Sequence, residues 1–235
     1  MNSKTKVRTG IGKLCRDPLD KNSEVVDDDS EKANILSKYF SSVLTVEPDG
    51  PVPVLEDRPV NKPMPALSIT TEKVLKLLEK LKTNKTPGLD EISPLVLKEI
   101  APYIAEAVTE IFKKSLAEAA LPSDWKSSVI AAIFKKGLTT LASNYRPVAL
   151  TSILCKVLET LVRDSILEHL VSNNLLSKRQ YGFLPKRSTT LQLLKVIDEW
   201  SVCLERGEPV DAIYTDFQKA FDKVPHKRLL SKLKA

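Results

Sequence analysis

The chain has few of the residues that build disulfide frameworks, zinc sites or membrane spans. It contains three cysteines and two histidines in 235 residues, and Cys15, Cys155 and Cys203 are far apart. An odd and scattered set of cysteines is typical of reduced thiols, and two histidines do not favour zinc chemistry. No run approaches the roughly 18 apolar residues that cross a bilayer, and the polar start lacks the apolar region of a signal peptide. We therefore expect an intracellular protein, cytoplasmic or nuclear, with no membrane partner.

The composition does provide a core and an uneven positive charge. Hydrophobic residues make up 42% of the chain, which is enough for one or two folded domains. The formal net charge is +6, and residues 178–235 carry 12 basic and 7 acidic side chains. Such an excess favours a polyanion such as nucleic acid, because binding releases counterions from the phosphates. A solvated lysine-rich surface explains the charge equally well.

Apolar residues recur mostly at helical spacing, so we predict a mainly helical chain. The acidic run Asp27–Asp29 suits the approach to a helix, and Ser30 is a plausible N-cap for a helix that continues to about Val46. Ser93 followed by Pro94 predicts a second helix start. Further helices are predicted at 74–81, 102–120, 152–170 and 189–206, the last with Leu194, Ile197, Trp200 and Leu204 on its buried side.

Two short segments predict strands, and a proline-rich segment separates the first helix from the rest. Prolines recur from Pro48 to Pro65, which predicts an extended linker because proline lacks the backbone donor. Residues 127–134 and 210–217 are rich in strand-forming residues and bounded by turn signals. If the strand at 210–217 has no partner, its exposed edge predicts instability or aggregation of the isolated chain.

The strongest chemical signal lies at the end of the second predicted strand. A carboxylate there, Asp216, would be exposed where a metal ion and a substrate can reach it. Phosphoryl transfer uses such oxygens, since Mg²⁺ prefers carboxylate and carbonyl ligands and paired ions can activate both reacting oxygens. From the spacing alone, Asp216 and Asp222 are also consistent with a surface charge and a cap for a helix that begins near Pro225.

The segment Asp216–His226 resembles the first palm motif of LINE-type reverse transcriptases, the polymerases of non-LTR retrotransposons. It reads Asp-Phe-Gln-Lys-Ala-Phe-Asp-Lys-Val-Pro-His. Upstream segments resemble earlier parts of the same family in the same order, which is more specific than any single match. These are Asn84–Asp90, Asn144–Leu150, Gln180–Phe183 and Arg187–Thr189.

The resemblance implies an α+β fold in three parts. Residues 1–64 would form a helical connector and a proline-rich linker, residues 65–209 the mainly helical fingers, and residues 210–235 the first strand of an incomplete palm. The implied activity is RNA-directed DNA synthesis by two-metal nucleotidyl transfer. It uses Mg²⁺, an RNA template, a DNA primer and deoxynucleoside triphosphates.

The resemblance also implies roles for single residues. Asp216 would bind the catalytic metal through its side chain, and the carbonyl of Phe217 could add a ligand. Phe221 would lie beneath the incoming sugar and exclude a 2′-hydroxyl. Without the resemblance, Phe221 is better explained as an ordinary core aromatic.

Basic and polar residues in the upstream motifs complete the implied site. Lys186 and Arg187 would lie near the triphosphate, although a solvated turn and helix cap is an equal alternative. Arg146 would contact template backbone or triphosphate, or else would pin a loop through backbone carbonyls. Gln180 and Phe183 would shape the surface that faces the template.

One departure from the family pattern affects the expected activity. Reverse transcriptases need a later aromatic-x-Asp-Asp motif to complete the metal site, and adjacent aspartates occur here only within Asp27–Asp29. We therefore expect no polymerase activity from this chain by itself. Two alternatives are a nucleic-acid-binding remnant without catalysis and a truncated gene product without a role as a protein.

Overall fold

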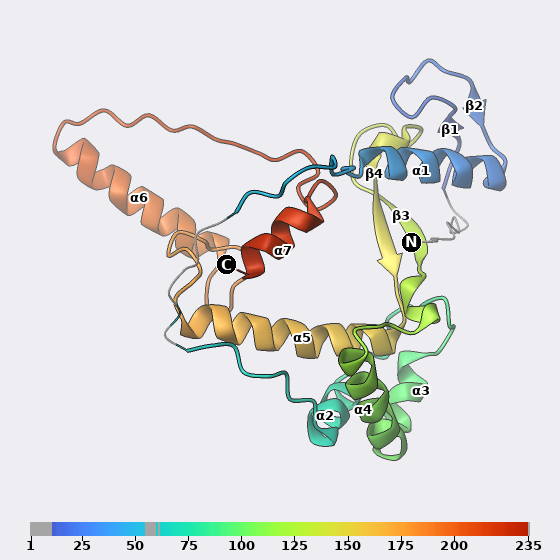
Figure 1. The fold of residues 1–235 in the computed structure, drawn as a ribbon. Coiled ribbons are helices and arrows are strands. Elements are labelled where there is room, and N and C mark those ends of the chain that lie inside the picture. The colour runs from blue at the N-terminus through green and yellow to red at the C-terminus, as the bar shows by residue number, and fades with distance from the viewer. Residues whose placement is uncertain (1–10, 55–59, 61, 235) are drawn as a thin grey trace.

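The computed structural model describes residues 11–54, 60 and 62–234, and its described part is mainly helical with two small antiparallel hairpins (Figure 1). This confirms the α+β class in outline. No described helix has both the length and the apolar character needed to cross a membrane. In chain order the elements are β1 Leu14–Cys15, β2 Val25–Val26, α1 Asp29–Val43, α2 Thr71–Glu79, α3 Pro94–Glu99, α4 Ala101–Ala117, the 3₁₀ helix Ser123–Lys126, β3 Val129–Phe134, the 3₁₀ helix Ala142–Asn144, β4 Tyr145–Leu150, α5 Ile153–Ser172, α6 Thr189–Glu205 and α7 His226–Lys234.

Local capping chemistry explains where α1 and α3 start. The predicted cap Ser30 is wrong, because α1 begins after Asp28, whose carboxylate accepts a hydrogen bond from the Glu31 amide at 2.9 Å. A side chain at Asp28 reaches the free amides of the first turn, whereas Ser30 already lies within the helix. The prediction at Ser93 is confirmed, since its hydroxyl accepts from the Leu95 amide at 3.2 Å.

The main core lies where α2 and α4 pack near one end of α5 (Figure 1). Its centre is Phe112 on α4, which is fully buried and meets Trp125 edge to face at 5.7 Å between ring centroids. Edge-to-face packing suits the charge distribution of aromatic rings and adds to the gain from burying them. Val74 and Leu78 of α2 and Leu158 of α5 close the cluster.

A second core joins the N-terminal helix to the β3–β4 hairpin. Leu36 and Tyr39 of α1 pack with Leu14, Ala142 and Tyr145. The β3 strand was predicted, but β4 was not. The β4 strand contains Pro147, and a proline within a run disfavours a central strand. Both strands of this hairpin are edge strands, so the missing proline donor is tolerated where β4 pairs antiparallel with β3.

Helix α6 confirms the helix predicted at 189–206 but not its predicted burial. Leu194 is 59% exposed and Ile197 is 56% exposed, and no residue of α6 is buried. The helix forms because Ser188 caps it, accepting from the Leu191 amide at 3.2 Å. An apolar stripe shows which side of a helix can be buried, but another element must be present to cover it.

The predicted strand at 210–217 is wrong for this structure. These residues form no strand, and their side chains are exposed along the long connection between α6 and α7, except for the half-buried Val210 (Figure 1). A strand needs a second backbone to complete its hydrogen bonds, and the described part of the chain offers none here. The proline-rich linker forms neither helix nor strand where it is described, while residues 55–59 and 61 lie outside the described residues.

Candidate functional site

Arg187 organises the loop that connects α5 to α6. Its Nη1 donates to the carbonyl oxygens of Lys178 at 2.8 Å and of Ser177 and Gln180. Its guanidinium also lies 5.5 Å from the ring centroid of Tyr181. Arginine suits this position because its planar fork of donors can bind several carbonyls while its face contacts an aromatic ring. Arg187 thus has the loop-pinning role that the sequence suggested as an alternative for Arg146.

Two exposed phenylalanines bring two motif segments into contact. Phe183 is 89% exposed and Phe221 is 79% exposed, yet their ring centroids are 5.8 Å apart with the planes at 83°. Phe221 is therefore not a core aromatic in this structure. The backbone of Phe183 is left-handed, with φ of 62°, a conformation that costs a non-glycine residue roughly 1–3 kcal/mol. Through these two rings, the segment Gln180–Phe183 contacts the segment Asp216–His226.

The remaining predicted site residues are more scattered. Lys186 lies in the loop before α6, also with a left-handed φ of 62°, and the Gln180 amide donates to the Gly182 carbonyl at 3.3 Å. Arg146 is exposed on β4 opposite Ile133. Within the described residues, no hydrogen bond joins Arg146 to the loop around Arg187 or to the segment around Asp216.

Asp216 and Phe217 are exposed in the connection before α7. Across the described residues, no three His, Cys, Asp or Glu side chains lie close enough together to hold a metal ion. Magnesium prefers octahedral oxygen coordination, so a single carboxylate is not a complete site. The residues near Asp216 therefore do not fit a metal ion by themselves.

The earlier motif Asn84–Asp90 contributes a close backbone contact. A Cβ atom added at Gly88 would lie 2.6 Å from the backbone nitrogen of Ser152 and 2.6 Å from the carbonyl carbon of Thr151. Glycine is required there because the turn before α3 packs directly on the start of α5. This motif residue thus supports the arrangement of the helical core.

The structure also shows a link that the sequence did not predict. Lys219, three positions after Asp216, donates from Nζ to the Tyr39 hydroxyl at 2.6 Å and lies 4.1 Å from the centroid of that ring. Thr45 donates to the Lys223 carbonyl at 3.2 Å. No local sequence pattern indicates that Lys219 and Tyr39, which are 180 positions apart, are partners.

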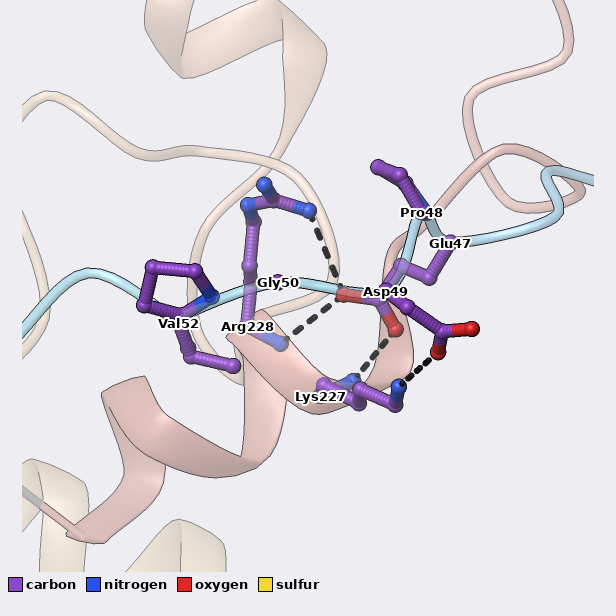
Figure 2. A pocket seen from close by; sticks show the side chains of 8 residues that line it. Glu47, Pro48, Asp49, Gly50, Val52, Lys227 and Arg228 are labelled. Atoms are coloured by element: carbon purple, nitrogen blue, oxygen red, sulfur yellow. Dashed lines mark hydrogen bonds and ion pairs between the residues drawn. The ribbon is translucent and has the colours of Figure 1, made fainter.

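A carboxylate from the N-terminal region caps α7 (Figure 2). Glu47 accepts hydrogen bonds from the backbone amides of Lys227 at 2.8 Å and Arg228 at 3.3 Å, and Lys227 Nζ lies 3.5 Å from Asp49. Partial burial opposes ionisation of Glu47, but the two amides and the neighbouring cations outweigh it and hold the pKa of Glu47 below its usual value. Negative charge is favoured at this end of a helix, where the first amides have no partner inside the helix.

Known proteins similar to this chain decide its family. Residues 133–235 match the reverse transcriptase (RNA-dependent DNA polymerase) family. The RNA-directed DNA polymerase from mobile element jockey of Drosophila melanogaster is 29% identical over 232 residues, or 98% of this chain and 25% of that protein. The Drosophila funebris protein of the same name is 30% identical over 232 residues, covering 97% and 25%. The chain belongs to the non-LTR retrotransposon reverse transcriptases.

A third relative agrees with this assignment and shows the extent of the similarity. The probable RNA-directed DNA polymerase from transposon BS of Drosophila melanogaster is 26% identical over 219 residues, or 90% of this chain and 24% of that protein. The chain thus spans about a quarter of the length of these reverse transcriptases.

Family membership confirms the resemblance inferred from the motifs. The reverse transcriptase match contains Asn144–Leu150, Gln180–Phe183 and Asp216–His226. Asn84–Asp90 precedes that match but lies inside the jockey alignments, which span nearly the whole chain. The Phe183–Phe221 contact therefore joins two segments of the family sequence.

Proposed function

We propose that this chain provides the fingers, residues 65–209, and the start of the palm, residues 210–235, of an RNA-directed DNA polymerase. The family match supports the polymerase class. The observation that carries the proposal is the contact between Phe183 and Phe221 on an exposed surface, beside the segment of Asp216. The substrates would be an RNA template, a DNA primer and deoxynucleoside triphosphates.

Within this proposal, the segment 216–221 would meet the incoming nucleotide. Asp216 would supply a side-chain oxygen and Phe217 a carbonyl oxygen to Mg²⁺, which the family generally uses, together with acidic ligands that the described residues do not provide. Phe221 would exclude a 2′-hydroxyl by steric contact with the sugar. Its packing against Phe183 supports this role, because a ring held from one side has fewer orientations available.

The basic residues of the fingers would bind phosphates. Lys186 and Arg187 would lie near the triphosphate, and Arg146 would contact template backbone or triphosphate, where charge-assisted hydrogen bonds are strongest. Gln180 would face the template. Arg187 supports this arrangement in a second way, since its bonds to Lys178 and Gln180 hold the loop that carries the other groups.

The polymerase proposal is tested by Asp216→Asn in a protein that carries this chain together with a complete palm. Primer extension on an RNA template should fall at least about a hundredfold, because the amide cannot replace the charge of a metal-binding carboxylate. Asp211→Asn is the matched control, since Asp211 is also exposed on the same connection. Extension that survives Asp216→Asn would disprove the assigned metal ligand.

A second candidate is nucleic-acid binding without catalysis, which the exposed surface favours. Phe183 lies in the same loop as Lys178, Arg179 and Lys186, and Phe221 contacts it. Aromatic and basic groups together suit stacked bases and phosphates. The 235-residue chain should then bind single-stranded RNA with an affinity that falls as salt rises. Phe183→Ala should weaken binding, whereas Tyr103→Ala, a change of an exposed aromatic on α4, should not.

A further inference from the structure

The N-terminal region and the C-terminal region run side by side with a nearly constant sequence offset. The contacting residues of one segment each meet a residue that follows by 178 to 181 positions, so the two segments run in the same direction. Figure 1 shows the chain after α1 passing the start of α7. The contacts are Tyr39 with Lys219, Thr45 with Lys223, Glu47 with Lys227 and Arg228, and Pro53 with Ser231.

The charges of these segments are complementary. Residues 45–53, which we call the strap, contain Glu47 and Asp49 and no lysine or arginine. The facing segment 219–231 contains four basic residues and one acidic residue, Asp222. Exposed ion pairs such as Lys227–Asp49 contribute little by themselves. The Glu47 carboxylate is different, because only 11% of its side chain is exposed and it binds two backbone amides.

The connection continues from the strap into a packed core. Tyr39 is 9% exposed and belongs to the cluster that includes Leu36 and Tyr145. Its ring and hydroxyl hold Lys219, whose own backbone is left-handed with φ of 53°. Residues 216–225, which we call the motif loop, carry Asp216 and Phe221 and lead into α7. Lys219 lies between Asp216 and Phe221, so Tyr39 restrains the centre of the motif loop and the strap restrains its exit into α7.

We propose that Tyr39 and Glu47 are positioning residues for the loop that carries Asp216 and Phe221. The N-terminal region that contains Tyr39 and Glu47 would then help to position the polymerase site, in addition to preceding it in the sequence. The proposal rests on the proposed polymerase function for its consequence in catalysis. Its structural part, the restraint of residues 219–231 by the strap, stands independently of that function.

The structural part is tested by hydrogen exchange on the 235-residue chain with Glu47→Ala. Exchange in residues 219–231 should accelerate about tenfold, because two amides lose a charged acceptor. Glu106→Ala is the matched control, since Glu106 is a glutamate exposed on α4. Glu47→Gln should recover part of the protection, because its amide oxygen can still accept.

Two results would overturn this restraint. Exchange of residues 219–231 in Glu47→Ala that equals exchange in Glu106→Ala would show that the cap does not hold the loop. Acceleration spread equally over α2, α4 and α5 would show general destabilisation, with no specific link to the motif loop.

The catalytic consequence is tested in a protein with a complete palm. Tyr39→Phe keeps the ring beside Lys219 and removes only the hydroxyl acceptor, so it should lower kcat for nucleotide addition about threefold with little change in KM. An unchanged kcat would overturn the positioning role. If the parent protein does not polymerise, the proposed function fails, whereas the exchange result on the strap remains valid.

Discussion

Helices α4 and α6 are each 17 residues long, and their surroundings differ completely. Helix α4 buries one face against α2 and α5, with Phe112 at its centre. Helix α6 has an apolar stripe that includes Leu194 and Ile197, and the stripe is exposed to solvent. Both segments form regular α-helices, so the difference teaches that helix formation and burial are separate outcomes of one sequence pattern.

The largest expected effect breaks the packed side of this comparison. Phe112→Ala should lower the free energy of unfolding by about 3–5 kcal/mol, because it removes a buried ring and leaves a cavity beside Trp125. Leu194→Ala on α6 should change it by less than about 0.5 kcal/mol, since that residue is already 59% exposed. Urea unfolding followed by circular dichroism measures both. Equal losses for the two variants would mean that α6 is covered in solution.

A smaller difference in stability is expected between two motif glycines. Gly88 packs on the start of α5 in the helical core, and Gly182 lies in the exposed loop before α6. Gly88→Ala should lower the free energy of unfolding by about 1–3 kcal/mol, because the new methyl group meets the rigid backbone at Thr151 and Ser152. Gly182→Ala should have little effect, as nothing lies within 4 Å of its added Cβ. Thermal unfolding of the two variants compares them directly. A destabilised Gly182→Ala would show that the loop around Arg187 packs more tightly than its exposure suggests.

The smallest expected effect concerns pH. The pKa of Glu47 is lower in the folded chain than its ordinary value, so its contribution is present above that ordinary value and is lost as pH falls through the folded pKa. Acidification should therefore lower the protection of residues 219–231 from hydrogen exchange, measured relative to the intrinsic exchange rate at each pH. This loss should precede any loss of protection in α4. Glu47→Gln should remove this extra pH dependence. Its persistence in Glu47→Gln would assign it to another group.

Local chemistry made much of this fold predictable. The Ser93–Pro94 start, the β3 strand and the extents of α5 and α6 depend on caps, spacing and turns that lie within a few residues. The segment 210–217 was predicted as a strand from side chains suited to one, but a strand also needs a neighbouring backbone, and residue preferences do not reveal whether one is present.

The sequence predicted which segments would form the candidate site, but it did not predict how these segments contact one another. Motif resemblance predicted roles for Asp216, Phe221 and Arg187, and these roles stay predictions, while the contact of Phe221 with Phe183 and the carbonyl bonds of Arg187 depend on how a loop folds back. The pairing of Glu47 with the first turn of α7 had no sequence signal, because any acidic residue near a helix start could serve.

The offset between the strap and its partners also determines when these contacts can form. The strap leaves the ribosome about 180 residues before the amides that Glu47 caps, a delay of roughly 10 to 40 s at 5–20 residues per second. During that time α1 and the hairpin core can fold, but the strap has no partner to bind. Contacts so distant in the sequence also carry a large loop-closure entropy, which delays them until intervening structure shortens the path. The strap therefore docks late in folding, and it can dock only after residues 219–231 have been synthesised.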